Sequence, residues 1–156
     1  MTIIDRDRLL ETTRCACFGL RKAARAVTQV YDEALRPAGL RTTQFSLLAQ
    51  LRLGGSAPMT RLAEDTVLDR TTLARNLEVL VRDGLVQIRT GADARVREVA
   101  ITRAGSARID EAFPLWQRAQ RAMTKRLGGR QLDRMLDDLA ATVAVAEQTE
   151  KMDARE

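Results

Sequence analysis

The chain has 156 residues, of which 45% are hydrophobic, 30% are charged and only 3% are aromatic, and its formal net charge is +5 at pH 7. A chain of this length suits one domain, or one compact module with extensions that pack elsewhere. With so few aromatic residues the core has to be built mainly from leucine, alanine and valine, which favours helices and argues against a β-sandwich.

The composition also argues against several classes of function. The sequence contains no histidine, which removes Ser-His-Asp and Cys-His catalysis together with the commonest metal ligand. It contains no glycine-rich phosphate loop, no G-x-S-x-G and no C-x-x-C. We therefore expect neither an enzyme nor a site for a metal or a cofactor.

The expected compartment is the cytoplasm. No apolar run is long enough to span a bilayer, and the charged stretch "MTIIDRDRLLETTR" lacks the apolar segment of a secretory signal. Two cysteines are too few for a disulfide framework and suit a reducing environment. The basic charge is carried almost entirely by arginine, which favours an anionic partner. No membrane partner is expected, since no apolar run can span a bilayer.

The first half of the chain predicts two helices of ordinary length. Residues 7–35 are free of proline and rich in helix formers, and Pro37 and Gly39 then end the helix. The stretch "TTQFSLLAQLRL", residues 42–53, predicts a second helix that Gly54 and Gly55 close.

Two shorter helices follow, joined by a very short connection. Thr60 can cap a helix over "RLAEDT", and Asp69 can cap the next one, its carboxylate reaching the free N–H groups of Thr71 or Thr72. Only "VLD" lies between the two helices, so the pair is a helix-turn-helix candidate.

The second helix of this pair has one apolar and one polar face. Its apolar residues follow the i, i+4, i+7, i+8 pattern of a buried stripe: Leu73, Leu77, Leu80 and Val81. At about 100° per residue, Thr71, Arg75 and Arg82 fall on the opposite face, with Thr72 at its edge. Gly84 then ends the helix.

The stretches "LVQIRT" and "REVAIT" predict two short strands. The link "GADAR" between them contains Asp93 and ends in Arg95, with Arg97 just beyond. A helix-turn-helix followed by a hairpin with a basic tip is a winged helix. From Thr102, a plausible cap, the chain predicts two long helices separated by Gly128 and Gly129.

These segments together resemble the MarR family of bacterial transcription regulators. The specific parts are "LRTTQFSLLAQL", "LDRTTLARNLEVLVRDGLV" and "DARVREVAITRAG", and the outer helices agree in length and order. The resemblance implies a mainly α fold with a β-hairpin wing: a winged helix-turn-helix over residues 41–103, within a helical dimerisation domain made from residues 1–40 and 104–156. It also implies a homodimeric repressor that binds double-stranded, pseudopalindromic DNA.

The resemblance and the helix geometry together indicate which residues would contact DNA. A helix fits the major groove, and side chains near its N-terminus reach base edges. The candidates are Arg70, Thr71, Thr72 and Arg75 on the helix, and Arg95 and Arg97 in the wing. The family's wing arginine enters the minor groove, and Arg95 matches it, with Asp93 as the acid that orients it. Residues 56–103 carry eight basic and seven acidic side chains, so a positive surface has to come from their arrangement.

The first helix holds Cys15 and Cys17, and here the sequence is similar to the organic-hydroperoxide-sensing branch of the family. Cys17, followed by Phe18, takes the place of that branch's reactive cysteine, and Tyr31 matches one of its tyrosines. Arg21 stands where another tyrosine would be, one turn from Cys17, and can favour a thiolate. A small aromatic effector, or cysteines that serve only as packing residues, are the alternatives. A disulfide between the two cysteines is not expected within an intact helix.

Two other classes of function stay open. A threonine-arginine face is in many proteins only a solvated surface, so an all-helical interaction or scaffold module without sequence-specific DNA binding is the second hypothesis. It leaves the wing unexplained. A small enzyme would need a constellation of acidic or cysteine side chains that the sequence does not offer.

Overall fold

The computed structural model describes residues 5–91 and 95–153. It consists mainly of helices with one small antiparallel sheet, and the chain forms two compact units, Met1–Trp116 and Gln117–Glu156. In these described stretches no helix combines the length and the apolar character needed to cross a bilayer. The expected fold class, mainly α with a small β wing, is confirmed.

The N-terminal segment, expected to be a single helix over residues 7–35, is interrupted. It comprises α1 (Arg6–Leu10), the 3-10 turn η1 (Glu11–Arg14) and α2 (Ala16–Leu35). Thr12 and Thr13 donate their hydroxyl groups to carbonyls one turn earlier, both at 2.7 Å. Cys15 then turns to extended backbone with ψ 121°. Side chains that bond to the backbone in this way compete with helical hydrogen bonding, so the prediction of a continuous helix is wrong.

The connection from α2 to α3 is fixed by two polar side chains. The turn η2 (Arg36–Ala38) and Gly39, with φ 68°, lead into α3 (Thr42–Gly54), as predicted. The carboxylate of Asp32 accepts a hydrogen bond from the N–H of Thr42 at 2.7 Å. On the other side of the turn, the guanidinium of Arg108 donates to the carbonyl of Ala38 at 3.1 Å. The last residue of the turn and the first residue of α3 are therefore each held by a side chain of another helix.

The predicted helix-turn-helix is confirmed as α4 (Met59–Thr66) and α5 (Arg70–Arg82). The connection turns sharply at Val67, a non-glycine residue in left-handed conformation with φ 50°. The predicted cap at Thr60 is wrong, because α4 begins at Met59, two residues before the predicted start at Arg61, and Pro58 occupies the cap position without a side-chain hydrogen bond. Proline is tolerated at the start of a helix because its fixed φ suits it and no N–H is needed there.

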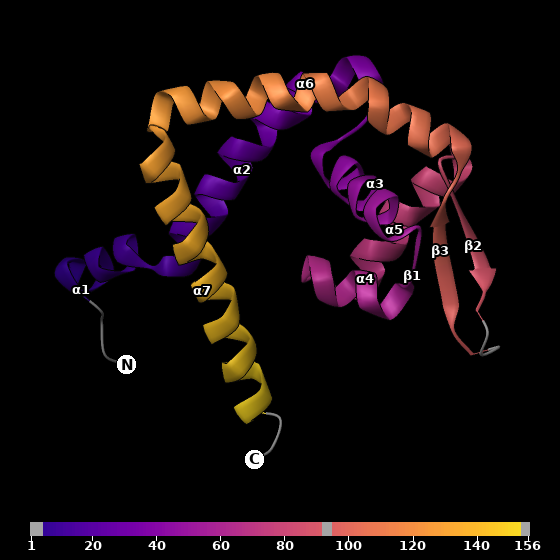
Figure 1. Cartoon of the computed structure of the whole chain (residues 1–156). Helices are drawn as coiled ribbons and strands as arrows, with labels where there is room; N and C mark the ends of the chain where they lie inside the picture. The colour runs from indigo at the N-terminus through magenta and orange to yellow at the C-terminus, as the bar shows by residue number, and fades with distance from the viewer. Residues whose placement is uncertain (1–4, 92–94, 154–156) are drawn as a thin grey trace. The chain divides into compact units, whose positions relative to one another are not determined.

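The sheet has one more strand than the sequence predicts. The predicted strands are β2 (Val86–Thr90) and β3 (Arg97–Ile101), and a third, β1 (Ser56–Pro58), lies just before α4. The order is β1-β3-β2, and both pairings are antiparallel, with Ser56 opposite Ala100 and Val86 opposite Ile101. Figure 1 shows β2 and β3 extending beside the helices as the wing.

The core of the first unit is aliphatic, as the composition predicts. Its most completely buried side chains are Leu35, Leu47, Leu48, Leu51, Leu62, Leu73, Leu77, Leu80 and Val99. They come from α2 to α5 and from β3, so the winged helix shares one core with the end of α2. Val81, predicted to belong to the buried stripe of α5, is 41% exposed and does not.

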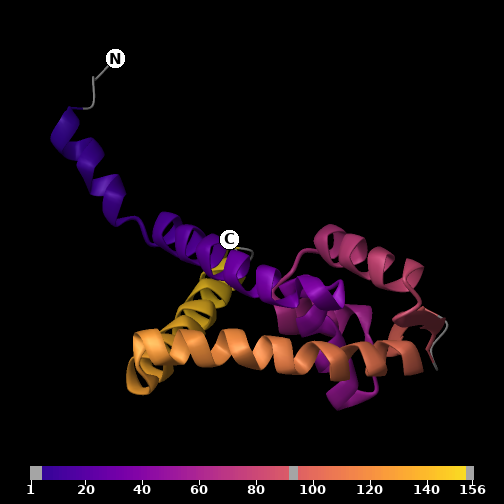
Figure 2. The same cartoon turned by 90° about the horizontal axis from the view of Figure 1, so that it is seen from above.

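Two long helices complete the chain. Thr102 accepts a hydrogen bond from the N–H of Gly105 at 3.0 Å and so caps α6 (Arg103–Leu127), as expected. Figure 2 shows α6 as one uninterrupted helix. Gly128, with φ 83°, separates it from α7 (Gly129–Asp153). The helix α7 leaves large apolar side chains in the open: Leu136, Leu139, Val143 and Val145.

Candidate nucleic-acid interface

The first turn of α5 is organised by Asp69. Its carboxylate accepts hydrogen bonds from the N–H of Thr72 at 2.9 Å and from the hydroxyl of Thr72 at 2.6 Å. These bonds lower the pKa of Asp69 below its usual value, the hydroxyl of Thr72 contributing most. The predicted cap is confirmed, and the hydroxyl proton of Thr72 is directed to Asp69 and away from any other acceptor.

The polar face of α5 is exposed over its N-terminal half. Thr71 and Arg75 are exposed on this face, whereas Leu73 and Leu77, on the opposite face, are 1% exposed. Arg70, which begins the helix on the side of Leu73, is also exposed. Asn76 lies at the edge and donates to the carbonyl of Thr72 at 2.9 Å. The helix therefore presents one threonine and two arginines to solvent near its positive N-terminal end.

The wing brings its arginines towards α5. Arg95 and Arg97 line a cavity together with Arg70, although the three are far apart in the sequence. Both wing arginines are exposed. Asp93, the predicted orienting acid, lies outside the described residues.

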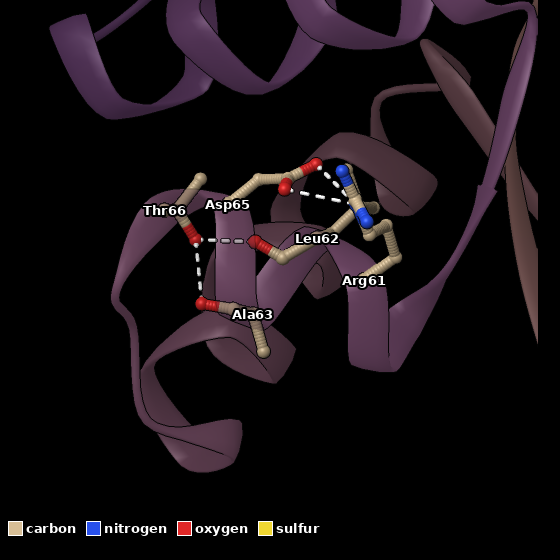
Figure 3. A network of polar contacts seen from close by, with 5 residues as sticks. All are labelled: Arg61, Leu62, Ala63, Asp65 and Thr66. Carbon is tan, nitrogen blue, oxygen red and sulfur yellow. Dashed lines mark hydrogen bonds and ion pairs between the residues drawn. The ribbon is translucent and has the colours of Figure 1, made fainter. Parts of the chain in front are cut away.

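Ion pairs neutralise two arginines of this region that lie away from the N-terminal half of α5. In α4, Arg61 contacts Asp65 at 2.9 Å, as Figure 3 shows. At the far end of α5, Arg82 contacts Asp83 at 3.1 Å. In the described part of the chain no ion pair joins Arg70, Arg75 or Arg97 to an acid. Within a region of nearly balanced charge, the exposed Arg70, Arg75 and Arg97 thus keep their charges uncompensated by an ion pair.

The C-terminal end of α5 is joined closely to the wing and to α6. The N–H of Gly84, whose φ is 69°, bonds to the carbonyl of Val81, and the N–H of Leu85 bonds to the carbonyl of Leu80 at 2.8 Å, which is a Schellman motif. The hydroxyl of Thr102 donates to the carbonyl of Gly84 at 2.7 Å. One hydroxyl therefore joins Gly84, the glycine that ends α5, to the start of α6.

Figure 3 shows how α4 ends. The hydroxyl of Thr66 bonds back to the carbonyls of Leu62 and Ala63, at 2.5 and 3.4 Å. The N–H of Leu68 also bonds to the carbonyl of Ala63, at 3.0 Å. These bonds engage the carbonyls of Leu62 and Ala63 in the last turns of α4, so the tight turn into α5 is defined by local hydrogen bonds.

Proteins of known structure share this architecture. The M. tuberculosis transcriptional regulator MosR, crystallised in complex with DNA, is 45% identical over 85% of this chain and 96% of its own, with a TM-score of 0.78. This chain belongs to the MarR family of transcriptional regulators.

More distant relatives agree with this assignment. A MarR variant from E. coli, complexed with operator DNA, superposes over 90% of this chain and 99% of its own with a TM-score of 0.72, and at 22% identity it shows the fold alone. The uncharacterized HTH-type transcriptional regulator YwoH of Bacillus subtilis (strain 168) is 28% identical over 92 residues, which are 59% of this chain and 67% of YwoH. The chain matches no protein-family model.

The cysteines of this MarR-family chain lie at the start of α2. Cys15 is the residue before the helix and Cys17 is its second residue, and both are exposed free thiols. The prediction that no disulfide joins the two cysteines assumed that both lie inside one intact helix. That assumption is wrong for Cys15, which precedes the helix.

The structure does not bring all the predicted sensor residues together. Arg21 lies one turn from Cys17 on the same helix. Tyr31 is fourteen residues from Cys17 along α2, which corresponds to about 21 Å at the helical rise. Burial raises the pKa of Tyr31, so its phenol stays protonated at neutral pH. Within one chain Tyr31 is therefore out of reach of Cys17.

Sequence reasoning missed several residues of this region. Met59, Val96 and Thr60 line the cavity between α4, α5 and the wing. Nothing in their local sequence indicates this, because the cavity forms only when three separate segments meet. Gly105 was also missed, although a glycine in the first turn of a helix is an available signal of close packing. A methyl group added there would overlap the carbonyl of Leu85.

Proposed function

We propose that this protein is a homodimeric repressor that binds a pseudopalindromic DNA operator and leaves it in response to a small aromatic or oxidant signal. The observation that carries the proposal is the 45% identity, over 96% of its length, to a regulator crystallised with DNA. Acting on the DNA of a bacterial cell, such a repressor would be cytoplasmic.

The exposed face of α5 supports the same role from physics alone. We propose that Arg75 makes a forked contact with a guanine, and Thr71 a base or phosphate contact, when the N-terminal half of α5 enters the major groove. Arg95 in the wing would enter the adjacent minor groove. Thr72 contributes by holding the cap with Asp69, and its side-chain oxygen can still accept a hydrogen bond.

Exposed apolar side chains on the terminal helices support a dimer. On α7, Leu136 and Leu139 are 51% and 38% exposed although neighbouring Leu132 is 8% exposed. On α2, Phe18 is 60% exposed. A second copy would cover such side chains and would place two equivalent α5 helices about 34–36 Å apart, one turn of DNA. We propose that residues 1–40 and 104–156 form this dimerisation domain, with residues 41–103 as the DNA-binding domain.

The exposed thiols support an oxidant signal as one form of release. An organic hydroperoxide would convert a thiolate to a sulfenic acid, with an alcohol as the other product. Cys17 has a cation one turn away in Arg21, which favours the thiolate. A small aromatic effector is the alternative signal.

The test is selection of bound sites from random double-stranded DNA with the full-length protein. We expect a pseudopalindrome whose half-sites are one turn apart. On that operator, Arg75→Ala should cost about 1–3 kcal/mol of binding free energy and relax the preference at one base pair per half-site. Arg82→Ala is the matched control, because Arg82 lies on the same helix but is paired with Asp83 at its far end. Recovery of no enriched sequence would refute the proposal.

A further inference from the structure

A cavity of about 270 Å³ opens between α4, α5 and the wing. Its lining residues are Met59, Thr60, Arg70, Leu73, Arg95, Val96 and Arg97. Three of these are arginines and none is acidic. The lining therefore has the charge of an anion-binding site, with an apolar floor of one methionine, one leucine and one valine.

The arginines reach the cavity because of the strand and helix geometry. Arg97 lies two residues before the fully buried Val99 on β3, so it shares that strand's inner face. Arg70 is the first residue of α5, three positions before the buried Leu73. Between the described residues, no hydrogen bond or ion pair engages the side chain of Arg70 or of Arg97. Both guanidinium groups can bind a ligand without giving up a partner.

The chemistry of the lining fits a phosphate joined to a sugar. Guanidinium groups match two phosphate oxygens with two parallel N–H bonds. The hydroxyl of Thr60 adds a donor, and Pro58 at the cap of α4 places no side-chain acceptor in front of that helix. The apolar floor suits the carbons of a deoxyribose. The volume is below the range of about 300–1,000 Å³ usual for pockets that enclose small molecules.

We propose that this cavity seats one backbone phosphate of each operator half-site, held by Arg70 and Arg97 with the hydroxyl of Thr60. The proposal rests on the proposed function and assigns different roles in DNA binding to different arginines. Arg97 anchors the wing to the DNA backbone without reading sequence, whereas Arg75 contacts bases. Because the phosphate bridges α5 and the wing, it also fixes the distance at which Arg95 enters the minor groove.

The first measurement is the dependence of DNA affinity on salt. Arg97→Gln should lower the slope of log K against log salt by about 0.9 for each lost phosphate contact, hence by about 1.8 for a dimer on two half-sites. Affinity should fall by the same factor on the operator and on random DNA. Arg89→Gln is the matched control, because Arg89 faces away from the core on β2, opposite Glu98, and it should leave the slope unchanged.

A second variant guards against a local misfold of the wing. Arg70→Gln lies on another element and should lower the slope in the same way. The double variant should lose little beyond either single one, since both arginines hold the same group. Independent, fully additive losses would mean two separate contacts and would overturn the shared seat.

The second measurement determines which backbone phosphate of the operator occupies the cavity. Operators that carry a neutral methylphosphonate at one backbone position at a time should weaken parent binding at one position per half-site, and Arg97→Gln should lose nothing further there. Inorganic pyrophosphate at constant ionic strength tests a free anion as the ligand. If it displaces DNA from the parent but not from Arg97→Gln, and no methylphosphonate position matters, the backbone proposal is overturned.

The outcomes separate this inference from the proposed function. If the parent binds its operator and Arg97→Gln has the same slope of log K against log salt as the parent, the proposed phosphate site is wrong but the proposed repressor function is not affected. If the parent binds no DNA at all, both the proposed repressor function and the proposed phosphate site are wrong.

Discussion

The junction of β2, β3 and α6 gives a prediction whose size follows from the structure. Gly105 is the third residue of α6, and a Cβ there would overlap the carbonyl oxygen of Leu85 and lie 2.9 Å from Cγ1 of Ile101. Non-bonded carbons are stable at about 3.5–4.0 Å, so Gly105→Ala forces α6 away from the sheet. The carbonyl of Leu85 cannot yield freely, because it accepts the N–H of Thr102 at 3.0 Å and its hydroxyl at 3.1 Å.

The expected loss combines two effects. Overpacking costs about 1–3 kcal/mol, and weakening the two hydrogen bonds adds about 1 kcal/mol each. Alanine regains about 1 kcal/mol through its helix propensity, which is too little to compensate. We expect the free energy of unfolding to fall by about 2–4 kcal/mol, measured by urea denaturation followed by circular dichroism at one fixed protein concentration.

Gly54→Ala is the matched control for this experiment. Gly54 is also helical, at the end of α3, and a Cβ there meets nothing within 4 Å. It should be neutral or slightly stabilising. An unfolding midpoint for Gly105→Ala equal to that of the parent, with an unchanged m-value, would show that the close packing inferred here is absent.

Four further predictions follow from the candidate site and the terminal helices. Arg95→Ala should weaken operator binding and reduce the preference for flanking A·T tracts, whose narrow minor groove attracts arginine; an unchanged footprint over the flanks would remove it from the contacts. Deletion of residues 128–156 should yield monomer or aggregate by light scattering and abolish specific binding, and a stable deletion dimer that protects both half-sites would contradict this. Cys17→Ser should bind DNA normally but stay bound in dilute organic hydroperoxide that releases the parent, while Cys15→Ser shows whether a second sulfur takes part; if oxidant leaves the parent on its operator, the thiols are not sensors. The lowered pKa of Asp69 means that its carboxylate stabilises the fold fully above the ordinary value of 3.8 and loses that contribution as the pH falls through its lower folded value; the difference in urea midpoint between parent and Asp69→Asn should therefore change only in that acid range, and a change near neutral pH would refute the assignment.

The elements that sequence predicts correctly are those whose cause is local. Asp69 caps α5, Gly84 ends it and Thr102 begins α6, because each makes bonds within a few residues or supplies a backbone conformation. The buried leucines of α5 follow from helical periodicity alone. The MarR-family resemblance extended this local reading to the wing arginines.

The features that sequence does not predict depend on distant partners. The stretch "SAP" of β1 has no strand pattern and ends in Pro58, and it becomes a strand only because β3 pairs with it. Val81 fits the apolar period, but no neighbouring element covers it. The cavity arginines come from two segments whose meeting depends on how the wing folds back. The interruption before Cys15 required knowing that two threonine hydroxyls would bond to the preceding turn.

The pairing of β1 with β3 has a consequence for the order of folding. Ser56 lies opposite Ala100, so both helices of the helix-turn-helix and all of β2 belong to a single loop that this pairing closes. Local helices form quickly, but closing a long loop carries an entropy cost before its contacts are made. Backbone amides of β1 should therefore become protected from hydrogen exchange no earlier than those of α5. During synthesis, a chain from which β3 has not yet emerged can form α5 but lacks the strand that pairs with β1. The helix-turn-helix is therefore fixed in place only after β3 has been added.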